Sequence, residues 1–551
     1  MKESPAIDDP AAHDATPLPE GTGTVLPEKA PLQPWAPPWP AARRFLDVVN
    51  VLLLSAVAFL IREWRIGLPT TKYFDEIYYV KSATEYLAHA PDSNTVHPPL
   101  GKLIIALFMQ AYAAVAAPLQ QMGLLQGPLE SASWRTACLV LGTAMVAITY
   151  ALAFRLFRNR FVAVVAAFLL TIDFLHVVQS RITMLDMPVA FFILLGSYGA
   201  WRYVTATEKP WGWAIFTVTM FAIGTPCKWN SLFAASGATV AMLGLKSWRS
   251  RREFVFSMLG VAVLYVIAVP AIYLASFVPL ASTQYTWAQF RADPVASVQK
   301  TVDQIRANHD LMYKFRYDDK QFTHRYMSKF WQWPTLARPI WYHYEEHVDP
   351  GYSVFPRENQ SFLGRLVWRG QQPDKYVDGV VAVGSPWVWW TFFLLFILTL
   401  MQSVIYPVGL ACYGAARLRP SPLDPGAEPP SSRLHALAHR WRLLCDGIHR
   451  WRLGPDRPFL FLILLYLPQV ILWSVNKGFF FYMLPCVPYM CIFMGAVLQE
   501  WLDMKGGRFF IALYLGLALV FFVAYYPLLT AYPLPKGLYN ILIPPWAVYW
   551  V

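Results

Sequence analysis

The sequence has few charged residues and few cysteines for its length. Asp, Glu, Lys and Arg make up 15% of the 551 residues, whereas hydrophobic residues make up 56%. A soluble protein carries roughly 25% charged residues, so this composition excludes a soluble globular protein and predicts a polytopic membrane protein. The six cysteines form no CxxC pair, which argues against both a disulfide framework and a zinc site.

The beginning of the sequence lacks the pattern of a cleavable signal peptide. Residues 1–42 are instead rich in Pro, Ala and acidic residues, a composition typical of a disordered tail. The formal charge of +12 does not require a nucleic acid as partner, because Lys and Arg collect in the cytoplasmic loops of membrane proteins. We therefore expect no nucleic-acid binding.

Long apolar segments are abundant and predict the topology. A spanning helix needs roughly 20 apolar residues, and about eleven segments satisfy this requirement. The expected spans are 46–62, 134–154, 161–178, 186–203, 211–227, 230–246, 254–279, 387–413, 458–475, 479–499 and 509–529. The sequence therefore predicts an all-α polytopic membrane protein with two large loops, 63–133 and 280–386, on one side of the membrane.

The distribution of Lys and Arg predicts the orientation. Basic residues are dense in "RLFRNR" (155–160), in "LKSWRSRR" (245–252) and in the loop 414–457. Because positive loops stay inside, this side is expected to be cytoplasmic, together with the N-terminus. Arg62 and Arg65 on the other side are exceptions to the rule.

Both large loops are then expected outside, and neither is a simple connection. In the first, Pro98 and Pro99 precede an apolar stretch that is amphipathic enough to lie along the membrane surface rather than cross it. The second loop, 280–386, is polar and aromatic. A loop of this length is usually functional, so we expect the functional residues on the outer side.

Several polar and charged residues share a predicted position on the outer side, in the first outer loop or at the outer ends of successive spans. They are Asp75, Glu76, His97, Lys102, Arg135, Arg181, Asp186, Lys228 and Lys477. Charges at membrane depth are costly, and they usually pair or line a functional cavity. We therefore expect these side chains to form one shared polar site.

The residue types indicate the chemistry of such a site. A cluster of Arg and Lys with few metal-type ligands favours a phosphate or pyrophosphate group. A carboxylate within reach is suited to act as general base for an alcohol nucleophile. In a membrane, a lipid-linked phosphate is a natural donor. Transfer of a group from a lipid phosphate to a hydroxyl would use all of these features.

Each residue also has a plainer interpretation. Asp75 and Glu76 are equally compatible with a solvated acid pair in a loop. Isolated cations at the outer ends of helices are commonly snorkelling anchors, and the many Trp and Tyr residues are typical of the aromatic belt. Only the convergence of several charges on one face favours the functional interpretation.

Several longer segments stand in one order between about residues 45 and 500 of the chain. They are "YFDEIYYVKSATEYL…HPPLGKLIIAL", "DFLHVVQSRITMLDMPVAFF" (173–192), "GTPCKWNSLF" (224–233), "HRYMSKFWQWPTLARPIWYHYE" (324–345), "GSPWVWW" (384–390) and "FFFYMLPCVPYM" (479–490). In combination they resemble the protein O-mannosyltransferases, membrane-embedded glycosyltransferases of the GT-C class.

The resemblance implies a GT-C fold of eleven helices, with residues 43–551 as one transmembrane catalytic domain. It implies transfer of mannose from a polyprenyl-phosphate-mannose donor to Ser or Thr of a protein, with inversion at the anomeric carbon. It implies no metal and no other cofactor. The expected partners are this donor, the lipid bilayer and a polypeptide acceptor met during Sec translocation.

The resemblance also assigns roles to residues. The family's acidic pair falls on Asp75, as the base towards the acceptor hydroxyl, and on Glu76, as its support. The positions near the donor phosphate are Arg135, Lys228 and Arg181. The positions with structural or acceptor-side roles are His97, Pro98, Pro99, Asp186, His324, Arg325 and Tyr482.

One feature departs from the eukaryotic members of that family. The loop 280–386, about 100 residues long, leaves no room for the β-trefoil (MIR) domain found there. The departure indicates a bacterial chain, located in the plasma membrane with an extracytoplasmic active site. The sequence does not predict the oligomeric state.

Other functions have weaker support. The runner-up is another GT-C enzyme that uses a lipid-phosphate sugar and transfers it to a lipid or glycan acceptor. An oligosaccharyltransferase is disfavoured because the sequence has no "WWD" motif. A transporter would place charges near the bilayer midplane and would show internal repeats, neither of which is expected here.

Overall fold

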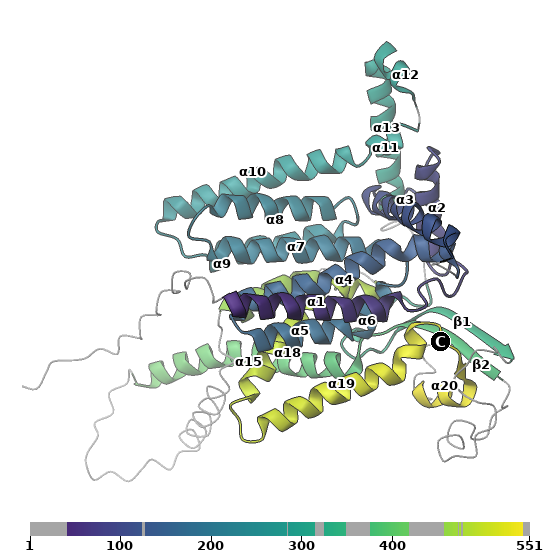
Figure 1. Ribbon diagram of the computed structural model, residues 1–551. Helices are drawn as coiled ribbons and strands as arrows, with labels where there is room; N and C mark the ends of the chain where they lie inside the picture. The colour runs from purple at the N-terminus through teal and green to yellow at the C-terminus, as the bar shows by residue number, and fades with distance from the viewer. Residues whose placement is uncertain are drawn as a thin grey trace, which may run out of the picture. The chain divides into compact units, whose positions relative to one another are not determined.

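The computed structural model describes residues 41–123, 127–283, 285–314, 324–348, 375–417, 457–471, 473–474 and 478–543 (Figure 1). The chain divides into two units, Met1–Phe45 and Leu46–Val551, and the elements discussed below belong to the second. The predicted tail at 1–42 and the predicted basic loop at 414–457 lie outside the described residues, apart from a few terminal positions.

Helices make up most of the described chain. In order they are α1 (Ala41–Glu63), α2 (Glu76–Leu87), α3 (Leu100–Gln121), α4 (Leu129–Phe157), α5 (Arg160–Thr171), α6 (Phe174–Gln179), α7 (Asp186–Thr205), α8 (Pro210–Gly224), α9 (Asn230–Leu245), α10 (Arg251–Ala275), α11 (Val278–Ala281), α12 (Trp287–Ala292), α13 (Pro294–Tyr313), α15 (Pro386–Arg417), α17 (Arg457–Ile471), α18 (Val487–Trp501), α19 (Gly507–Leu529) and α20 (Lys536–Leu542). Two 3-10 helices, η2 (Phe330–Gln332) and η3 (Phe480–Cys486), lie among them.

The prediction of a helical polytopic membrane protein is confirmed, but the count of eleven spans is not. Helix is present in each of the predicted segments. Among the described residues, six helices are long and apolar enough to cross a membrane, and several further apolar helices have only 10–17 residues. Length and composition alone therefore support fewer spans than the sequence predicts.

The predicted span at 161–178 is interrupted. α5 ends at Thr171, and the Asp173 carboxylate then accepts a hydrogen bond of 3.0 Å from the backbone N–H of His176 at the start of α6. Such a side-chain cap supplies an acceptor for an N–H group that has no partner within its own helix. One aspartate therefore divides the apolar run into two helices.

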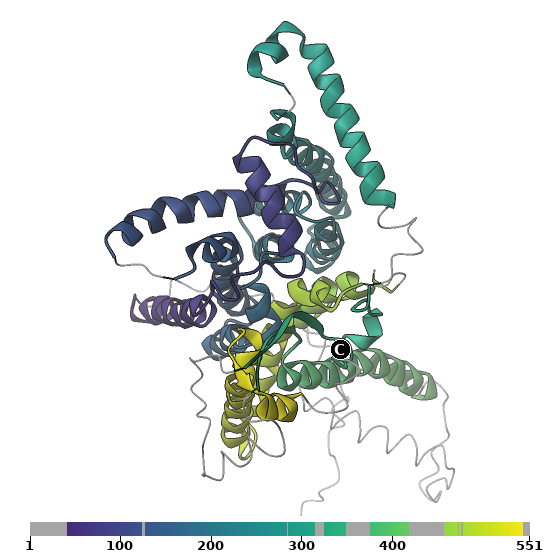
Figure 2. The same ribbon diagram turned by 90° about the vertical axis from the view of Figure 1, so that its right-hand side faces the viewer.

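The helix α3 follows Pro98 and Pro99, as predicted. It is one of the six helices long enough to cross a membrane. Its direction nevertheless crosses that of α7 and α8, since Figure 2 shows α3 along its length where those two are seen nearly end-on. The crosswise direction favours the membrane surface, and its location there stays a prediction.

The helix α7 is central to the bundle. It packs against α4, α8 and α9, while α5 packs against α18. A Cβ atom at Gly495 of α18 would lie 2.8 Å from the carbonyl oxygen of Val162 in α5. Only glycine allows the two helices to approach so closely. Close packing of this kind fixes the turn before α7, which carries several of the predicted site residues.

A small sheet accompanies the helices. β1 (Ile340–Val348), β2 (Lys375–Ala382) and β3 (Leu534–Pro535) form an antiparallel sheet in the order β1-β2-β3. The prediction of an all-α chain missed it. The available signal was the composition of "IWYHYEEHV", because Ile, Trp, Tyr and Val are enriched in strands.

Candidate active site

Most of the predicted site residues lie at or near the ends of helices. They come from the start of α2, from the first turns of α4, from the turn between α6 and α7, and from the turn between α8 and α9. The predicted convergence is found for Asp75, Asp186 and Lys228, because the last two influence the Asp75 carboxylate electrostatically. Lys102 instead forms an ion pair elsewhere, and Lys477 lies outside the described residues. The contacts described below divide the predicted set into groups with different partners.

Glu76 and Arg135 form a completely buried ion pair. Arg135 donates from Nε to Glu76 Oε1 over 2.9 Å and from Nη2 to Oε2 over 3.0 Å, and both side chains are fully inaccessible. The backbone N–H of Thr183 donates to the same Oε1 over 2.9 Å. Two parallel bonds of this kind fix geometry as well as charge. The Glu76 carboxylate is therefore fixed by three hydrogen bonds from two different helix ends and turns.

The remaining contacts of Arg135 are also within the protein. Its Nη1 atom donates to the carbonyl oxygen of Ile66 over 2.9 Å, and its guanidinium carbon lies 4.9 Å from the ring centroid of Tyr73. The prediction that Arg135 contacts a donor phosphate is not tested directly. Its geometry favours a positioning role, in which it holds the start of α2 against α4.

Lys228 and Asp186 form the second buried pair. Lys228 Nζ donates to the two carboxylate oxygens of Asp186 over 2.8 and 3.0 Å. The ammonium group also lies 4.5 Å from the ring centroid of Tyr482 and 5.4 Å from that of Phe481. An ammonium group has three donors, so this pair leaves one of them for a further acceptor.

Asp75 lies beside this second pair and is bound less tightly than Glu76. Its Oδ2 atom accepts a long hydrogen bond of 3.4 Å from the hydroxyl of Tyr79. Among the described residues, it belongs to no ion pair. Burial raises the pKa of Asp75 to about 6; Lys228 opposes this increase and Asp186 adds to it. Asp75 is half-buried, and a weakly paired carboxylate with a pKa near neutrality is suited to general-base catalysis.

The chain takes a sharp turn directly before Asp75. Phe74 has a φ of +54°, in the left-handed region that non-glycine residues rarely adopt. Its ring packs against Tyr342 of β1 and Phe481 of η3, with centroids 4.7 and 6.0 Å apart. These contacts hold the turn, so the sheet and η3 help to place Asp75.

Arg181 caps the end of α1. Its guanidinium group donates to the backbone carbonyl oxygens of Arg62, Trp64 and Arg65 over 2.5, 2.7 and 3.2 Å. The last carbonyl groups of a helix have no partner within the helix, and Arg181 supplies one. The prediction of a phosphate contact is untested, and this geometry favours a structural role.

The segment "HPP" lies between α2 and α3 in the chain and contacts the turn that carries Lys228. The His97 ring lies 6.0 Å from the ring of Tyr79, and Pro99 immediately precedes α3. The first residue of α3, Leu100, donates its N–H to the carbonyl oxygen of Pro226 over 3.1 Å. These contacts agree with the structural role predicted for His97, Pro98 and Pro99, which stays a prediction.

The two predicted residues of the second outer loop, His324 and Arg325, have different surroundings. The His324 ring lies 6.0 Å from the ring of Phe74 and 5.4 Å from that of Phe479, which places it next to the Asp75 turn. Burial lowers the pKa of His324, so the neutral ring is favoured. Arg325 is exposed and lies over the ring of Tyr326, at 4.8 Å. Its predicted role therefore has no geometric support.

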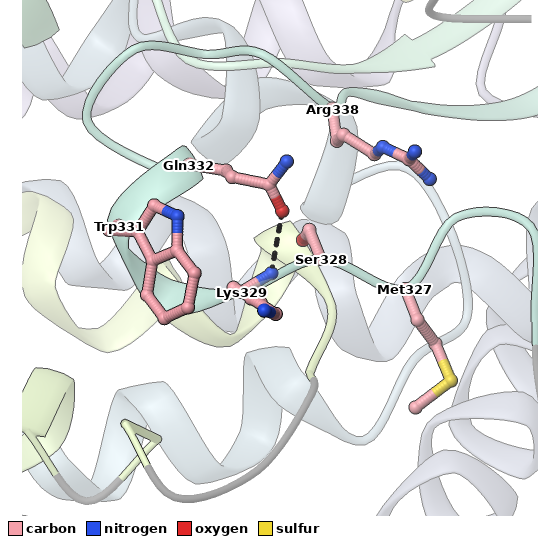
Figure 3. A pocket seen from close by; sticks show the side chains of 6 residues that line it. All are labelled: Met327, Ser328, Lys329, Trp331, Gln332 and Arg338. Carbon is pink, nitrogen blue, oxygen red and sulfur yellow. Dashed lines mark hydrogen bonds between the residues drawn. The ribbon is translucent and has the colours of Figure 1, made fainter.

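Sequence reasoning missed two tyrosines and a pocket. Tyr79 and Tyr342 both face the Asp75 region, and the spacing of four residues between Asp75 and Tyr79 on a helix was the available signal. A cavity of about 340 Å³ opens on the same outer loop (Figure 3). Its lining residues are Met327, Ser328, Lys329, Trp331, Gln332 and Arg338.

No group of three or more His, Cys, Asp or Glu side chains that could hold a metal ion occurs within the described part of the chain. The predicted independence from metal stays a prediction. The geometry shows a base candidate, a neighbouring cation and aromatic walls.

Comparisons with known proteins agree with the resemblance predicted from the sequence motifs. Residues 52–285 match the family model described as "Dolichyl-phosphate-mannose-protein mannosyltransferase". The "Polyprenol-phosphate-mannose--protein mannosyltransferase" of Mycolicibacterium smegmatis is 20% identical over 563 aligned positions, which cover 90% of this chain and 92% of that protein. The "Dolichyl-phosphate-mannose--protein mannosyltransferase 1" of Schizosaccharomyces pombe is 28% identical over 172 residues, or 30% of this chain and only 19% of that protein.

A solved structure has the same fold. The protein O-mannosyltransferase Pmt1-Pmt2 complex of S. cerevisiae, solved bound to the sugar donor, superposes with a TM-score of 0.62 at 12% identity. The match covers 90% of this chain and 92% of that chain. The chain thus resembles protein mannosyltransferases over most of its length, as its motifs predict, and it shares the fold of the Pmt1-Pmt2 structure.

Proposed function

We propose that this chain transfers mannose from a polyprenyl-phosphate-mannose donor to Ser or Thr hydroxyl groups of a polypeptide. The observation that carries the proposal is the contrast between two adjacent carboxylates. Glu76 is bound by Arg135 on both oxygens. Among the described residues, the Asp75 carboxylate has one long hydrogen bond, and its pKa is about 6. The names of the full-length relatives support the same donor and acceptor.

Asp75 is the proposed base. It takes the proton of the acceptor hydroxyl while that oxygen forms a bond to the anomeric carbon of mannose. The bond from the anomeric carbon to the phosphate oxygen breaks on the opposite face, so the configuration inverts. The polyprenyl phosphate leaves with the electron pair of that bond. General-base catalysis of this type contributes about 10²–10⁴-fold to a rate.

Lys228 is the proposed contact of the departing phosphate. It is held at its place by Asp186 and lies near enough to Asp75 to lower the pKa of that carboxylate. A fixed cation beside developing negative charge stabilises the transition state without reorganisation. Arg135 and Arg181 are proposed to act as positioning residues without touching the donor. Their described contacts hold the start of α2 and the end of α1.

The proposal includes a topology. Basic density at 155–160 and 245–252 favours a cytoplasmic location for the opposite ends of the helices. The Asp75 site then faces the extracytoplasmic side of the plasma membrane, where polypeptides emerge during Sec translocation. A Ser or Thr hydroxyl reaches the site from the aqueous side, while the donor reaches it from the bilayer.

A transfer assay tests the proposal. Purified protein receives radiolabelled polyprenyl-phosphate-mannose and either a peptide containing one Thr, the same peptide with Val in its place, or a lipid or glycan acceptor. Label on the Thr peptide alone is the expected result. Label on the lipid or glycan acceptor alone would favour the second candidate, a GT-C enzyme with another acceptor. The rate should be unchanged by EDTA, since loss of activity would contradict the metal-free chemistry.

A further inference from the structure

The helices α12 and α13 leave the spanning helix α10 and run across its direction. Figures 1 and 2 both show α13 crossing the direction of α8 and α10. The apolar segment Arg251–Ala281 is long enough to cross a membrane and only 11% of its most apolar window is buried. Only residues 282–286 separate it from α12. Because a residue spans at most about 3.3–3.6 Å, α12 begins within about 20 Å of the end of that segment.

Both helices are capped locally. The Thr286 hydroxyl and the Gln289 side chain form a capping box at the start of α12. The Asp293 carboxylate accepts a hydrogen bond of 2.9 Å from the N–H of Ala296 at the start of α13. Caps of this kind satisfy N–H groups that have no partner within the helix. The starts of both helices are therefore defined by their own sequences.

An apolar stripe runs along α13 at helical spacing. Its members are Val295, Val298, Val302, Ile305, His309 and Met312. Steps of three and four residues place them on one face. Met312 is buried, and Ile305 packs against the hydrophobic core. The C-terminal half of the stripe is therefore docked on the protein.

The N-terminal half of the same stripe is uncovered. Val295 is 80% exposed and Val298 is 51% exposed. In α12, Trp287 is 65% exposed, stacks on Phe290 with ring centroids 5.2 Å apart, and lies 5.4 Å from the guanidinium carbon of Arg291. A Trp with an apolar surface below it and a cation beside it is typical of residues at a membrane interface.

We propose that α12 and the N-terminal half of α13 dock into the outer surface of the phospholipid bilayer. The uncovered stripe continues an apolar face that is already in contact with the protein, and it starts within about 20 Å of a spanning segment. A helix of this type lies in the interface plane, with its apolar face at the boundary between headgroups and acyl chains. The bilayer therefore covers the exposed Val and Trp side chains.

The docked end of α13 connects this surface to the candidate site. The His309 ring stacks on Trp229 with centroids 5.9 Å apart, and His309 Nε2 lies 3.0 Å from the hydroxyl of Tyr273. Trp229 donates from Nε1 to the same hydroxyl over 3.1 Å. Trp229 directly follows Lys228 in the chain. The position of α13 on the bilayer thus helps to fix the turn that carries the proposed phosphate contact.

Site-directed spin labelling tests the docking without any assay of activity. Single cysteines replace Val295, Val298 and, as the control on the opposite face, Lys300 in the full chain reconstituted in phosphatidylcholine vesicles. The unsubstituted chain supplies the background from its native cysteines. Labels at 295 and 298 should collide mainly with oxygen, which concentrates in the bilayer, and the label at 300 mainly with a water-soluble nickel complex.

Two results would overturn the proposal. Equal access of the nickel complex to all three labels would show that the stripe stays in water. Shielding of 295 and 298 from both reagents would show that a protein surface, such as a second copy of the chain, covers the stripe.

A kinetic test rests on the proposed function and separates its failure from that of the docking. The double variant Val295→Asp/Val298→Asp places two carboxylates on the docking face. The matched variant Ala296→Asp/Ala307→Asp places two on the opposite, exposed face. In vesicles, the first should raise KM for the lipid-linked donor several-fold with unchanged kcat, and the second should change neither. Equal effects of the two variants would contradict the docking, whereas no transfer by any variant, including wild type, would contradict only the proposed function.

Discussion

Asp75 and Glu76 are adjacent in the chain but have opposite surroundings. Glu76 is inaccessible, accepts two hydrogen bonds from Arg135 and one from the backbone of Thr183. Asp75 is also enclosed, but its one described hydrogen bond is 3.4 Å long. A carboxylate whose oxygens are already occupied has little capacity to accept a proton, whereas an underbound one has that capacity. This difference is the basis of our proposal that Glu76 positions the site and that Asp75 takes the proton.

The largest effect, a loss of folding stability, is expected when the Glu76–Arg135 ion pair is broken. Arg135→Met leaves a buried carboxylate without its partner, which costs about 3–5 kcal/mol of stability. The variant should therefore unfold at a clearly lower temperature in detergent, measured at one scan rate. The double variant Glu76→Gln/Arg135→Met should regain part of the loss, because no buried charge is left unpaired. A single variant as stable as wild type would contradict the positioning role.

A smaller effect is expected at the other pair. Lys228→Gln removes the cation beside the proposed phosphate position. Hydrogen bonds to charged groups contribute about 1.5–3 kcal/mol, so kcat/KM for the donor should fall roughly 10–100-fold. The matched control is Lys246→Gln, since Lys246 donates to the backbone carbonyl oxygens of Tyr203 and Ala206 instead. Steady-state kinetics on both should show the change in kcat/KM at Lys228 alone. An unchanged kcat/KM there would place the phosphate elsewhere.

The pH profile of transfer tests the protonation of Asp75. With a pKa of about 6, Asp75 is deprotonated and active as a base above pH 6, and kcat should fall about tenfold for each pH unit below it. Lys228 lowers the pKa of Asp75, so Lys228→Gln should move the midpoint to higher pH. The acceptor peptide should contain no group that titrates between pH 5 and 8. A flat profile over that range would contradict the assignment of the base.

The smallest effect is expected at Tyr79. Tyr79→Phe removes only the 3.4 Å hydrogen bond to Asp75, and an ordinary hydrogen bond contributes about 0.5–1.5 kcal/mol. We expect kcat to fall by no more than about tenfold, with a slightly higher pH midpoint because that bond lowers the pKa of Asp75. Rates measured at several pH values separate the two effects. A loss as large as that from changing Asp75 itself would contradict the small contribution assigned to this hydrogen bond.

The sequence predicts which charged residues belong to the site better than it predicts which of them pair. Long apolar runs predict helices because a bilayer requires them, and charges at helix ends stand out in such a sequence. The pairing depends on packing: Arg135 is 59 residues from Glu76, and Lys228 is 42 residues from Asp186. No local pattern tells which carboxylate each cation meets. The contacts of Arg181 with backbone carbonyl groups were invisible for the same reason.

Two features of the fold were missed for local reasons. Asp173 reads as one charge within an apolar run, yet its capping of α6 divides that run. The sheet was missed because its partner strands are distant in sequence, with Val377 opposite both Glu346 and Leu534. Strand pairing across such separations is set by the tertiary fold, whereas a helix is set by its own sequence.

One measurement tests the central claim most directly. Asp75→Asn is compared with wild type in single-turnover transfer of radiolabelled mannose from the polyprenyl-phosphate donor to a Thr peptide, with donor binding and thermal unfolding measured on the same samples. The account predicts wild-type donor binding, an unfolding temperature at or above that of wild type because a desolvated charge is removed, and a transfer rate about 10²–10⁴-fold lower. Transfer at the wild-type rate by a folded Asp75→Asn variant that binds the donor would contradict it.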